Sequence, residues 1–365
     1  MRVLVTGGAG FVGSHVVDRL LAASHSVDVV DNLATGRRER VPAAARLHVC
    51  DLRDARLDSV LAAARPAVVV HVAAQAAVSR SVADPRFDAS VNVLGTIALL
   101  ESCKRAAVPR AVYISTGGAA YGDTDVLPTP EDHPLRPASP YGVSKVTAER
   151  YLEVWAGLTG ARGLTLRLAN VYGPRQDPAG EAGVIAIFTS RLLAGATCVV
   201  NGDGEQTRDY VYVGDVADAV ARAVAAPEAT GIANIGTGAE TSVNELYRRL
   251  ARLTDVRRAA EHAPAKPGEQ RRSLLDATRA KSLLGWSATT PARRRPQPDC
   301  RVVQEGADNM IDEELKAILA CPACKGDLLF EETRIICPAC RKAYPIRDGI
   351  PVMLISEAEP WSPAR

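Results

Sequence analysis

Short apolar runs alternate with longer helical patterns from Met1 to about Trp286. The apolar runs are rich in Val, Ile and Leu, show no polar alternation, and lie at 2–6, 26–30, 67–74, 111–115 and 164–170. Such runs are typical of parallel strands that are buried on both faces. Helical patterns separate them at 13–23, 90–107 and 142–159. The repeated strand–helix–strand order predicts an α/β fold with a doubly wound parallel sheet of the Rossmann type.

The pattern loosens after Asn170, where loops separate shorter helical stretches. We predict further helices at 184–195, 214–226 and 241–253. We therefore expect one unit over 1–286. Its core spans about 1–168, and a smaller substrate-binding part, mostly 169–286, closes over the carboxyl edge of the sheet.

Residues 287–309 break this rhythm, because Pro, Arg and polar residues dominate and no apolar period is visible. We interpret this stretch as a linker. The three arginines at 293–295 are compatible with nucleic-acid contact, but a solvated tether is the better interpretation. A second compact module is expected over 310–357, followed by a tail at 358–365.

Composition narrows the classes of function. Hydrophobic residues make up 47% and charged residues 24%, so most of the chain should be globular. The net charge of +2 is too small to argue for nucleic acid or an anionic membrane surface. The apolar runs are far shorter than the roughly 20 residues that a membrane span needs. The N-terminus opens directly into a strand pattern without a leader, and we expect a cytoplasmic protein.

A glycine-rich turn follows the first strand. Gly7, Gly10 and Gly13 have the spacing that lets a backbone approach a pyrophosphate at a helix N-terminus. Asp31 ends the second strand, where a carboxylate accepts from both ribose hydroxyls of NAD. Arg37 and Arg38 follow and would suit NADP instead, and we favour NAD. Asp51 is a candidate for the adenine edge or a simple helix cap.

A tyrosine and a lysine share one face of a predicted helix, since Tyr141 and Lys145 are four residues apart. A lysine beside a phenol favours the phenolate. The strand that ends in ISTGGAAYG supplies hydroxyls, and we expect Thr116 first, and Ser115 second, to bond a substrate hydroxyl and relay its proton to the tyrosine. No carboxylate appears in this loop before Asp123, which argues against elimination of water from a sugar.

Residues 1–286 resemble the extended short-chain dehydrogenase/reductase family, and most closely its UDP-glucose (UDP-galactose) 4-epimerases. The resemblance is carried by VTGGAGFVGSH, DNLATG, STGGAAYG, SPYGVSK, RLANVYGPRQDP, GDGEQTRDYVYVGDVADA, NIGTG and LGW. It implies that NAD stays tightly bound and is not consumed. It also implies that Tyr141 takes a proton from the hydroxyl at carbon 4 of a UDP-sugar. The 4-keto sugar then turns to present its other face, and hydride returns to that face. Lys145 would hold the ribose of the cofactor.

The resemblance also assigns contacts by matching motif. Further cofactor contacts are implied for Phe11, Val12, Asn32, Leu52, Ala73, Ala74, Gln75 and Asn92. Substrate contacts are implied for Thr116, Gly117, Gly118, Tyr141, Asn170, Val184, Phe188, Arg208 and Glu269. Among these, Asn170 and Arg208 would meet the diphosphate, Val184 and Phe188 the uracil, and Glu269 the uridine ribose.

The chain also departs from the family pattern. Gly117 stands where many epimerases carry a serine, so that role would pass to Thr116. Lys266 stands where an arginine is common, which replaces a bidentate fork by a point charge. Ser273 falls on the stretch that reaches the sugar pocket, and a small residue there would leave space for an N-acetyl group. The glucose, N-acetylglucosamine and glucuronate series all remain open.

Four of the eight cysteines form two CxxC pairs with twelve residues between them: Cys321, Cys324, Cys337 and Cys340. In a cytoplasmic chain this spacing argues for a metal before a disulfide. Four thiolates make a closed, structural zinc site, and a module of this size needs such a staple to fold. Iron in place of zinc and a redox use of the pairs stay open.

Residues 310–357 resemble short zinc-ribbon proteins, including the small subunits that stabilise methyltransferases. The matching text is MIDEELKAILACPACKGDL and ICPACRKAYPIRDGIPVML. The resemblance implies protein binding and no catalysis. Two alternatives to an epimerase are kept, a nucleotide-sugar 4-keto reductase or dehydrogenase and a non-catalytic scaffold. Relatives are commonly dimers through a four-helix interface, so we expect a homodimer.

Overall fold

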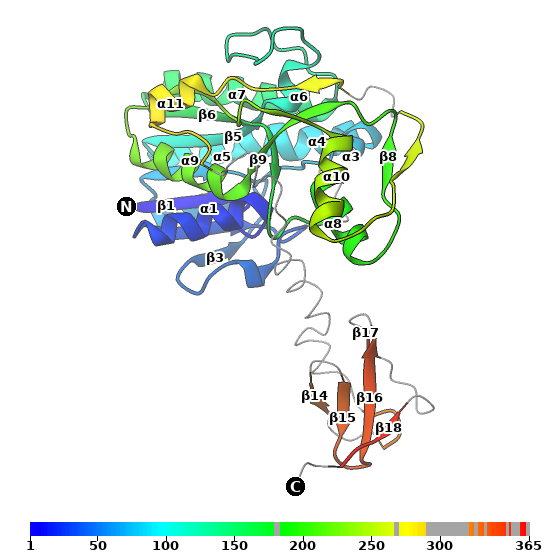
Figure 1. The fold of residues 1–365 in the computed structure, drawn as a ribbon. Coiled ribbons are helices and arrows are strands. Elements are labelled where there is room, and N and C mark those ends of the chain that lie inside the picture. Colours follow the sequence, from blue (N-terminus) through cyan, green and yellow to red (C-terminus); the bar gives the residue numbers. More distant parts are fainter. Residues whose placement is uncertain are drawn as a thin grey trace. The chain divides into compact units, whose positions relative to one another are not determined.

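The computed structural model describes residues 1–178, 183–265, 270–289, 321–324, 328–331, 334–347, 350–351 and 358–362. The chain divides into two compact units, Met1–Gln297 and Pro298–Arg365. The division falls within the stretch 287–309. Each unit is described by itself below (Figure 1).

A seven-stranded sheet forms the centre of the first unit, in the order β10-β6-β5-β4-β1-β2-β3. All its pairings are parallel. Its strands are β1 (Arg2–Thr6), β2 (Ser26–Asp31), β3 (Arg46–Val49), β4 (Val68–His71), β5 (Arg110–Thr116), β6 (Arg162–Leu168) and β10 (Gly231–Ile235). The five predicted strands are present, and the predicted doubly wound sheet is confirmed. The strand order reverses between β1 and β4, where α/β proteins bind ligands beyond the carboxyl ends of the strands.

Helices cover both faces of this sheet (Figure 1). The helical elements of this half of the chain are α1 (Phe11–Ala22), a 3₁₀ turn (Arg38–Arg40), α2 (Arg56–Ala64), α3 (Val78–Ala83), α4 (Pro85–Ala89), a π-helical turn (Ser90–Leu94), α5 (Gly95–Arg105), α6 (Gly118–Tyr121) and α7 (Pro140–Thr159). Alternate residues of β1 face opposite sides. Val3 and Val5 pack in the core under α1, whereas Leu4 packs in the core under α2, α5 and α7.

The seventh strand comes from the second half of the chain. β10 pairs with β6, and α9 (Val213–Ala225) packs beside α1. The sequence pattern did not indicate β10, because this strand is short and begins at a glycine with φ of +86°. The sequence predicts a single division of the first unit near residue 168. In the structure, a strand from beyond that point joins the main sheet, so the two parts share one sheet.

A smaller set of elements completes the first unit. Its strands are β7 (Asn170–Tyr172), β8 (Val199–Asn201), β9 (Thr207–Tyr212), β11 (Glu240–Ser242), β12 (Glu261–Ala263) and β13 (Arg272–Ser273), and its helices are α8 (Val184–Leu193) and α10 (Val243–Leu253). α8 and α10 share a separate core built on Phe188, Leu192, Leu246 and Leu250. The three helices predicted after Asn170 are present.

The first unit continues past its last predicted residue. After α11 (Thr278–Leu284), Trp286 is buried and its indole N–H donates to the carbonyl of Asp215. The Thr289 hydroxyl and backbone N–H donate to the Asp215 carboxylate. The predicted linker therefore begins later than residue 287, because its first residues pack against α9.

The second unit contains β14 (Leu329–Phe330), β15 (Arg334–Cys337), β16 (Lys342–Arg347), β17 (Ile350–Pro351) and β18 (Glu359–Pro360), all joined in antiparallel pairs. Its core consists of Cys321, Ile335, Cys337 and Tyr344. We had expected a tail at 358–365, but β18 pairs with β16 and extends the sheet. The physical reason is that the edge of β16 presents backbone N–H and C=O groups, with which a short strand can form hydrogen bonds.

Within the described ranges, none of the helices combines the length and the hydropathy needed to cross a membrane.

Candidate active site and metal centre

A cavity of about 1330 Å³ lies in the first unit. Its walls come from the start of α1, the loop after β4, the end of β5, the start of α7, β7 and α8. The predicted site residues on its lining are Phe11, Val12, Ala74, Ser115, Thr116, Gly118, Tyr141, Lys145, Asn170 and Arg208. The structure therefore brings the predicted catalytic residues to one cavity with several of the predicted ligand contacts.

The glycine turn is shaped by close backbone contacts. Gly7 has φ of +70°, and a Cβ on it would lie 2.6 Å from the backbone nitrogen of Ala73. A Cβ on Gly13 would lie 2.0 Å from the carbonyl oxygen of Gly7, whereas one on Gly10 would lie 3.2 Å from the same atom. Gly10 caps α1 without a side-chain hydrogen bond. The first N–H groups of α1 are therefore available to an anion.

Asp31 ends β2 as predicted and is 8% exposed. Its carboxylate accepts the backbone N–H of Ala9 at 3.0 Å and that of Leu33 at 2.8 Å. These bonds fix the carboxylate beside the glycine turn. Each oxygen keeps lone-pair capacity for a further donor, because an ionised carboxylate accepts about four hydrogen bonds.

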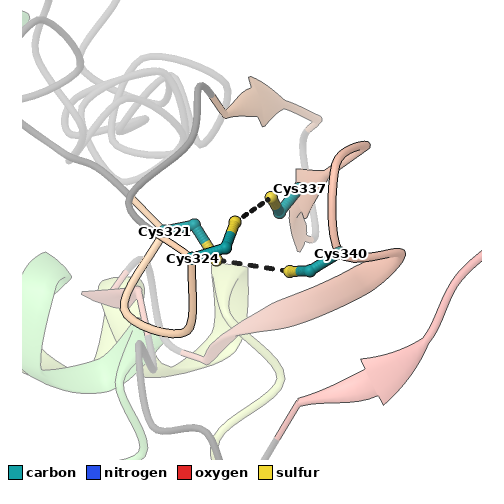
Figure 2. Close-up of side chains that lie close together, drawn as sticks. All are labelled: Cys321, Cys324, Cys337 and Cys340. Atoms are coloured by element: carbon teal, nitrogen blue, oxygen red, sulfur yellow. Dashed lines mark hydrogen bonds between the residues drawn. The ribbon is translucent and has the colours of Figure 1, made fainter.

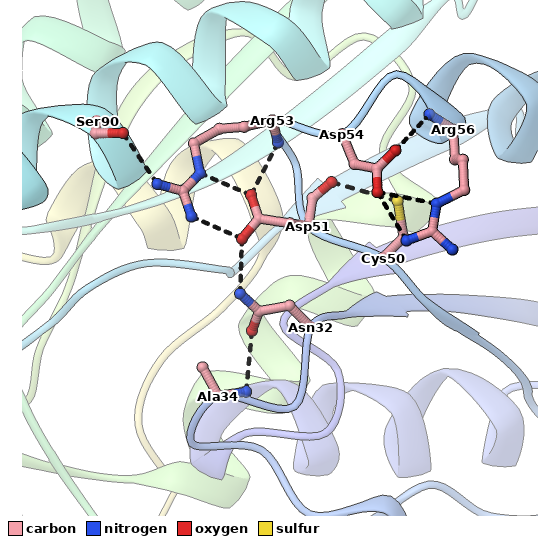
Figure 3. Close-up of polar contacts among 8 residues, drawn as sticks. All are labelled: Asn32, Ala34, Cys50, Asp51, Arg53, Asp54, Arg56 and Ser90. Atoms are coloured by element: carbon pink, nitrogen blue, oxygen red, sulfur yellow. Dashed lines mark hydrogen bonds and ion pairs between the residues drawn. The ribbon is translucent and has the colours of Figure 1, made fainter.

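Asp51 is held by a different set of partners (Figure 3). Arg53 reaches both carboxylate oxygens through its guanidinium at 2.7 and 2.8 Å, and the amide of Asn32 donates to one of them at 2.8 Å. The Arg53 side-chain hydrogen bonds, more than any other contact, hold the pKa of Asp51 well below its usual range. Asp51 thus accepts from protein donors in the described structure, and a contact with an adenine stays a prediction.

The loop after β4 is fastened by amides. The Asn92 side chain accepts the backbone N–H of Gln75 and donates to its carbonyl, each at 2.9 Å. The Gln75 side chain donates to the carbonyl of Ala77 and accepts its backbone N–H. Ala74 reaches the cavity lining, while Gln75, Asn92 and Leu52 are buried away from it. We infer that Gln75 and Asn92 shape the wall of the cavity.

Tyr141 and Lys145 lie in the first two turns of α7. This helix begins at Pro140, and Ser139 caps it by accepting the backbone N–H of Gly142. Lys145 is 3% exposed, and its Nζ lies 4.3 Å from the centre of the Tyr113 ring. A cation over an aromatic face is stabilised by the ring quadrupole.

Burial dominates the protonation of this pair. It lowers the pKa of the Lys145 ammonium to about 7, although the carboxylates of Glu149 and Asp88 work in the opposite direction. Burial raises the pKa of the Tyr141 phenol, and the charge of Asp88 adds to this rise. The sequence predicts that Lys145, joined by a bound nicotinamide cation, favours the phenolate, and this stays a prediction; in the described protein burial holds the pKa of the phenol above its ordinary value.

The two candidate hydroxyls have different partners. Ser115 is buried, and its hydroxyl donates to the Glu149 carboxylate at 2.5 Å. The Thr116 hydroxyl accepts the backbone N–H of Ala119 at 3.2 Å, and this bond does not use its own O–H as a donor. Thr116 is thus the hydroxyl that can donate into the cavity. Ser115, the second candidate from the sequence, uses its hydroxyl to bind Glu149 on α7.

The glycines after Thr116 make room for neighbouring segments. A Cβ on Gly117 would lie 2.5 Å from Cδ1 of Leu275, so a side chain at this position would meet the core. A Cβ on Gly118 would lie 3.6 Å from the Ser273 hydroxyl and 3.7 Å from Oδ1 of Asn170. Asp123 lies at the exposed rim, where it accepts the backbone N–H of Arg271.

On the predicted substrate side, Asn170 and Arg208 line the cavity, but Phe188 does not. Phe188 is 3% exposed and packs edge-on against Tyr247 inside the small domain. Ile187, Ser190 and Arg191 line the cavity from α8 instead. Phe188 lies on the buried face of this helix, with Ile185, Thr189 and Leu192. Glu269 and Lys266 lie outside the described residues.

Sequence reasoning missed the α8 positions just named, α3 and Gln270, whose side chain donates to the Gly122 carbonyl. The signal in VIAIFTSRLL was ambiguous, since both faces of this helix are apolar. The phase of the helix was needed to decide which residues face the cavity.

A buried ion pair supports the site from behind. The Arg167 guanidinium on β6 donates to both oxygens of Glu149 on α7, the shortest at 2.7 Å, and the side chains are 1% and 3% exposed. Arg167 also donates to the Tyr121 hydroxyl, which donates onward to Asn234 on β10. The pair therefore ties β5, β6, α7 and β10 together one helical turn beyond Lys145.

The candidate metal centre lies in the second unit. The sulfur atoms of Cys321, Cys324, Cys337 and Cys340 all lie within 4.8 Å of one another, and Figure 2 shows the two CxxC turns facing each other. Cys321 contacts Cys340 at 3.5 Å, and Cys324 contacts Cys337 at 3.4 Å. This donor set suits a tetrahedral thiolate site.

A tyrosine supports one of these thiols. The Tyr344 hydroxyl lies 3.2 Å from the sulfur of Cys321. Burial works to raise the pKa of the Cys321 thiol, but hydrogen bonds from Tyr344 and from the backbone of the CxxC turn outweigh it and lower this pKa to about 6. The thiolate form, which is the metal-binding form, is thereby favoured.

Comparison with known proteins gives two matches along the chain. Residues 3–236 match the NAD dependent epimerase/dehydratase family, and residues 312–349 match Trm112p-like proteins. A UDP-glucose 4-epimerase of Mycolicibacterium smegmatis is 48% identical over 291 residues, covering 78% of this chain and 93% of that relative. Both matches agree with the resemblances that the sequence motifs indicated.

Two solved structures are similar over most of the chain. The UDP-glucose 4-epimerase of Thermotoga maritima, solved with UDP-glucose, is 42% identical with a TM-score of 0.81, covering 84% of this chain and 99% of that one. The UDP-glucose 4-epimerase of Thermus thermophilus, solved with NAD, is 45% identical with a TM-score of 0.76, covering 80% of this chain and 96% of that one.

We predict that Glu149→Gln destabilises the first unit by about 3–5 kcal/mol, because it leaves a buried guanidinium without its carboxylate. Glu153→Gln is the matched control on the same helix, since Glu153 forms an exposed pair with Arg150 and should lose less than about 1 kcal/mol. Urea unfolding followed by circular dichroism measures both. Equal losses in the two variants would contradict the argument from burial.

We also predict that Cys337→Ser strips the second unit of zinc and unfolds β14 to β16, because these strands share a small core with the thiols. Metal content per chain is measured by mass spectrometry, and hydrogen exchange reports on the strands. Cys198→Ser, a buried thiol of the first unit, is the control and should leave the zinc content unchanged. Full zinc in the Cys337 variant would contradict a four-cysteine site.

Proposed function

Since the chain belongs to the NAD dependent epimerase/dehydratase family, we propose that it interconverts the carbon-4 epimers of a UDP-sugar through a transient 4-keto sugar, with NAD bound throughout. The glucose/galactose pair is the first candidate. One observation carries the proposal: Tyr141, Lys145 and Thr116 line one cavity together with Phe11 and Val12, the first residues of α1 after the glycine turn. UDP-glucose 4-epimerases that match over most of their length support it.

The residues present fit NAD. Gly7 and Gly13 lie too close to neighbouring backbone atoms to carry a side chain, which keeps the turn tight, and the N-terminus of α1 has no side-chain cap, so its N–H groups suit a pyrophosphate. Asp31 stands where it favours ribose hydroxyls and repels a 2′-phosphate. When bound, NAD would accept a hydride from carbon 4 of the sugar and return it to the opposite face.

The protein's own groups would handle the proton. Tyr141 accepts the proton of the carbon-4 hydroxyl and gives it back when the ketone is reduced. Thr116 donates a hydrogen bond to the same oxygen. The Lys145 ammonium and the positive charge of an oxidised nicotinamide ring both favour the phenolate, which offsets the effect of burial. Arg208 and Asn170 would hold the diphosphate.

The same family name covers dehydratases, and the loop 114–122 argues against that reaction. Elimination of water needs a proton donor for the leaving hydroxyl. This loop carries glycines after Thr116, and Asp123 lies at the exposed rim. A reductase or dehydrogenase that consumes free cofactor and a non-catalytic scaffold are the outcomes that the experiment below separates from an epimerase.

We further propose that the protein is a homodimer through the outer face of α7 and the π-helical turn that precedes α5. This face exposes apolar side chains, which are Leu94, Val143, Tyr151, Val154 and Leu158, the last of them 78% exposed. Several exposed apolar side chains on one helix are typical of protein–protein interfaces. A second copy that presents the same face would bury it with two-fold symmetry.

For the second unit we propose a structural zinc and a protein partner, supported by its match to Trm112p-like proteins and by its thiolate donors. The free cysteines of both units suit a reducing compartment. We place the protein in the cytoplasm on that ground.

We predict that the purified protein, without added cofactor, converts UDP-galactose, UDP-N-acetylgalactosamine or UDP-glucuronate to its 4-epimer at a fixed final ratio. Proton NMR of the anomeric signals follows each sugar separately. Tyr141→Phe should lower kcat by at least about 100-fold, because it removes the proton acceptor. Tyr247→Phe, which loses only a hydrogen bond to the Arg258 carbonyl, is the control.

No conversion of any of the three sugars, even after NAD is supplied, would refute the epimerase. Turnover that requires stoichiometric NADH would assign a reductase. A folded protein that binds neither nucleotide nor sugar would assign the scaffold.

We predict that Gly13→Ala purifies with at least about tenfold less NAD than the unsubstituted protein, because its Cβ would overlap the Gly7 carbonyl. Gly157→Ala is the control, since it lies on α7 outside this turn and its Cβ would meet nothing within 4 Å. The nucleotide released on denaturation is measured by chromatography. Equal retention in both variants would contradict the assignment of this turn to the cofactor.

A further inference from the structure

The carboxylate of Asp88 is buried beside the site and has no role in the chemistry above. Asp88 is 0% exposed. Its Oδ1 accepts the side-chain amides of Gln75 at 2.9 Å and Asn92 at 3.0 Å. Its Oδ2 has no hydrogen-bond partner within the part of the chain that the structure describes. A buried carboxylate oxygen without a donor is costly unless another charge compensates it.

Asp88 lies close to the catalytic helix. It belongs to α4, which packs against α7 and leads directly into the π-helical turn Ser90–Leu94. Burial is the largest influence on the pKa values of Lys145, Tyr141 and Tyr113, and the negative charge of Asp88 works to raise all three, after that of Glu149 in the case of Lys145. Asp88 is therefore buried between the loop after β4 and the helix that carries the Tyr–Lys pair.

The other charged and titratable groups near Lys145 are either neutral or paired with a cation. On α7 these are Tyr141 and Glu149, and Glu149 shares its charge with Arg167 from β6. On β5 the Tyr113 ring lies under the ammonium. On β4 burial lowers the pKa of His71 to about 3, so its ring is neutral. Among these described neighbours, Glu149 has Arg167 as its cationic partner, whereas Asp88 accepts only from neutral amides.

We propose that Asp88 is a positioning residue, the buried counter-charge that keeps Lys145 protonated beside Tyr141. The amides of Gln75 and Asn92 hold the carboxylate by one oxygen and leave its remaining charge for the ammonium. Coupling between the two charges does not depend on the reaction, whereas its consequence for turnover rests on the proposed function.

The same charge also has a cost, because it disfavours the Tyr141 phenolate. Removing it would let Lys145 lose its proton at lower pH and would let Tyr141 lose its proton at lower pH as well. Activity needs a charged lysine and an ionised tyrosine. Both limbs of the pH profile therefore move in the same direction, toward acid, when Asp88 becomes neutral.

The direct test titrates Lys145. The chain has seven lysines, so protein labelled with ¹³C at the lysine ε-carbon gives few signals, and that of Lys145 is identified by its loss in Lys145→Met. Asp88→Asn keeps an acceptor for the two amides and removes the charge. We expect the Lys145 midpoint to fall by about one pH unit. An unchanged midpoint overturns the proposal.

Two further variants guard against a purely structural explanation. Asp215→Asn removes another buried carboxylate, on α9, and should leave the Lys145 midpoint where it is. Asp88→Glu retains the charge and should keep the midpoint near that of the unsubstituted protein. If Asp88→Asn does not fold, Asp88→Ser provides the neutral side chain, and a Lys145 midpoint equal to that of the unsubstituted protein overturns the proposal there too.

Turnover gives the second readout. We expect the profile of kcat against pH in Asp88→Asn to move as a whole by about one unit toward acid. A uniform loss of kcat at every pH, with no displacement, would show that Asp88 only holds the amides and would overturn the proposal. If the unsubstituted protein epimerises none of the sugars, the proposed function fails, and the lysine titration still decides the coupling.

Discussion

The amine of Lys145 lies where water scarcely reaches it, which disfavours its charged form, and the groups packed around it respond to that constraint. The Tyr113 ring lies under the ammonium, and Glu149 follows one turn later on the same helix. Glu149 is itself compensated by Arg167, and that pair takes the hydroxyl of Ser115. The need to satisfy a buried charge thus extends from α7 through β5 and β6. Ser115 and Thr116 both line the cavity, but the hydroxyl of Ser115 donates to Glu149, which leaves the hydroxyl of Thr116 to donate into the cavity.

The sheet explains why these groups meet. Parallel strands end at one edge, and the crossing connections bring loops from distant parts of the chain to that edge. β10 and α9 return from the second half of the sequence to the core, so the cavity receives walls from both halves. Close backbone contacts then set its shape. Gly13 lies against Gly7, Gly117 against Leu275, and Gly122 against Arg136.

The two units are stabilised in different ways. The first buries continuous apolar cores on both faces of its sheet and a third in the small domain. The second has a small core in which Cys321 and Cys337 lie beside Ile335 and Tyr344. Two of its four candidate metal ligands are therefore also core residues, which is the arrangement expected when a short chain has too little apolar surface to fold without a staple.

Sequence alone determined the periodic and local features. Continuous Val, Ile and Leu runs identified five strands of the main sheet, because a strand covered on both faces needs apolar residues throughout. The glycine spacing, the i, i+4 pair of Tyr141 and Lys145, and the CxxC spacing followed from short-range geometry. The family resemblance added the substrate class, but not which of the named residues would line the cavity.

Tertiary structure decided what depends on long-range packing. The phase of α8 placed Phe188 in a core and Ile187 at the cavity, a choice that two apolar faces leave open. β10 joined the main sheet because β6 offered it an edge, although its own sequence is short and begins at a glycine. Ser115 and Asp88 gained their partners from α7 and from the loop after β4. The hydrogen bonds and ion pairs of a buried site depend on which segments pack together, and the hydrophobic periodicity of the sequence does not predict those long-range contacts.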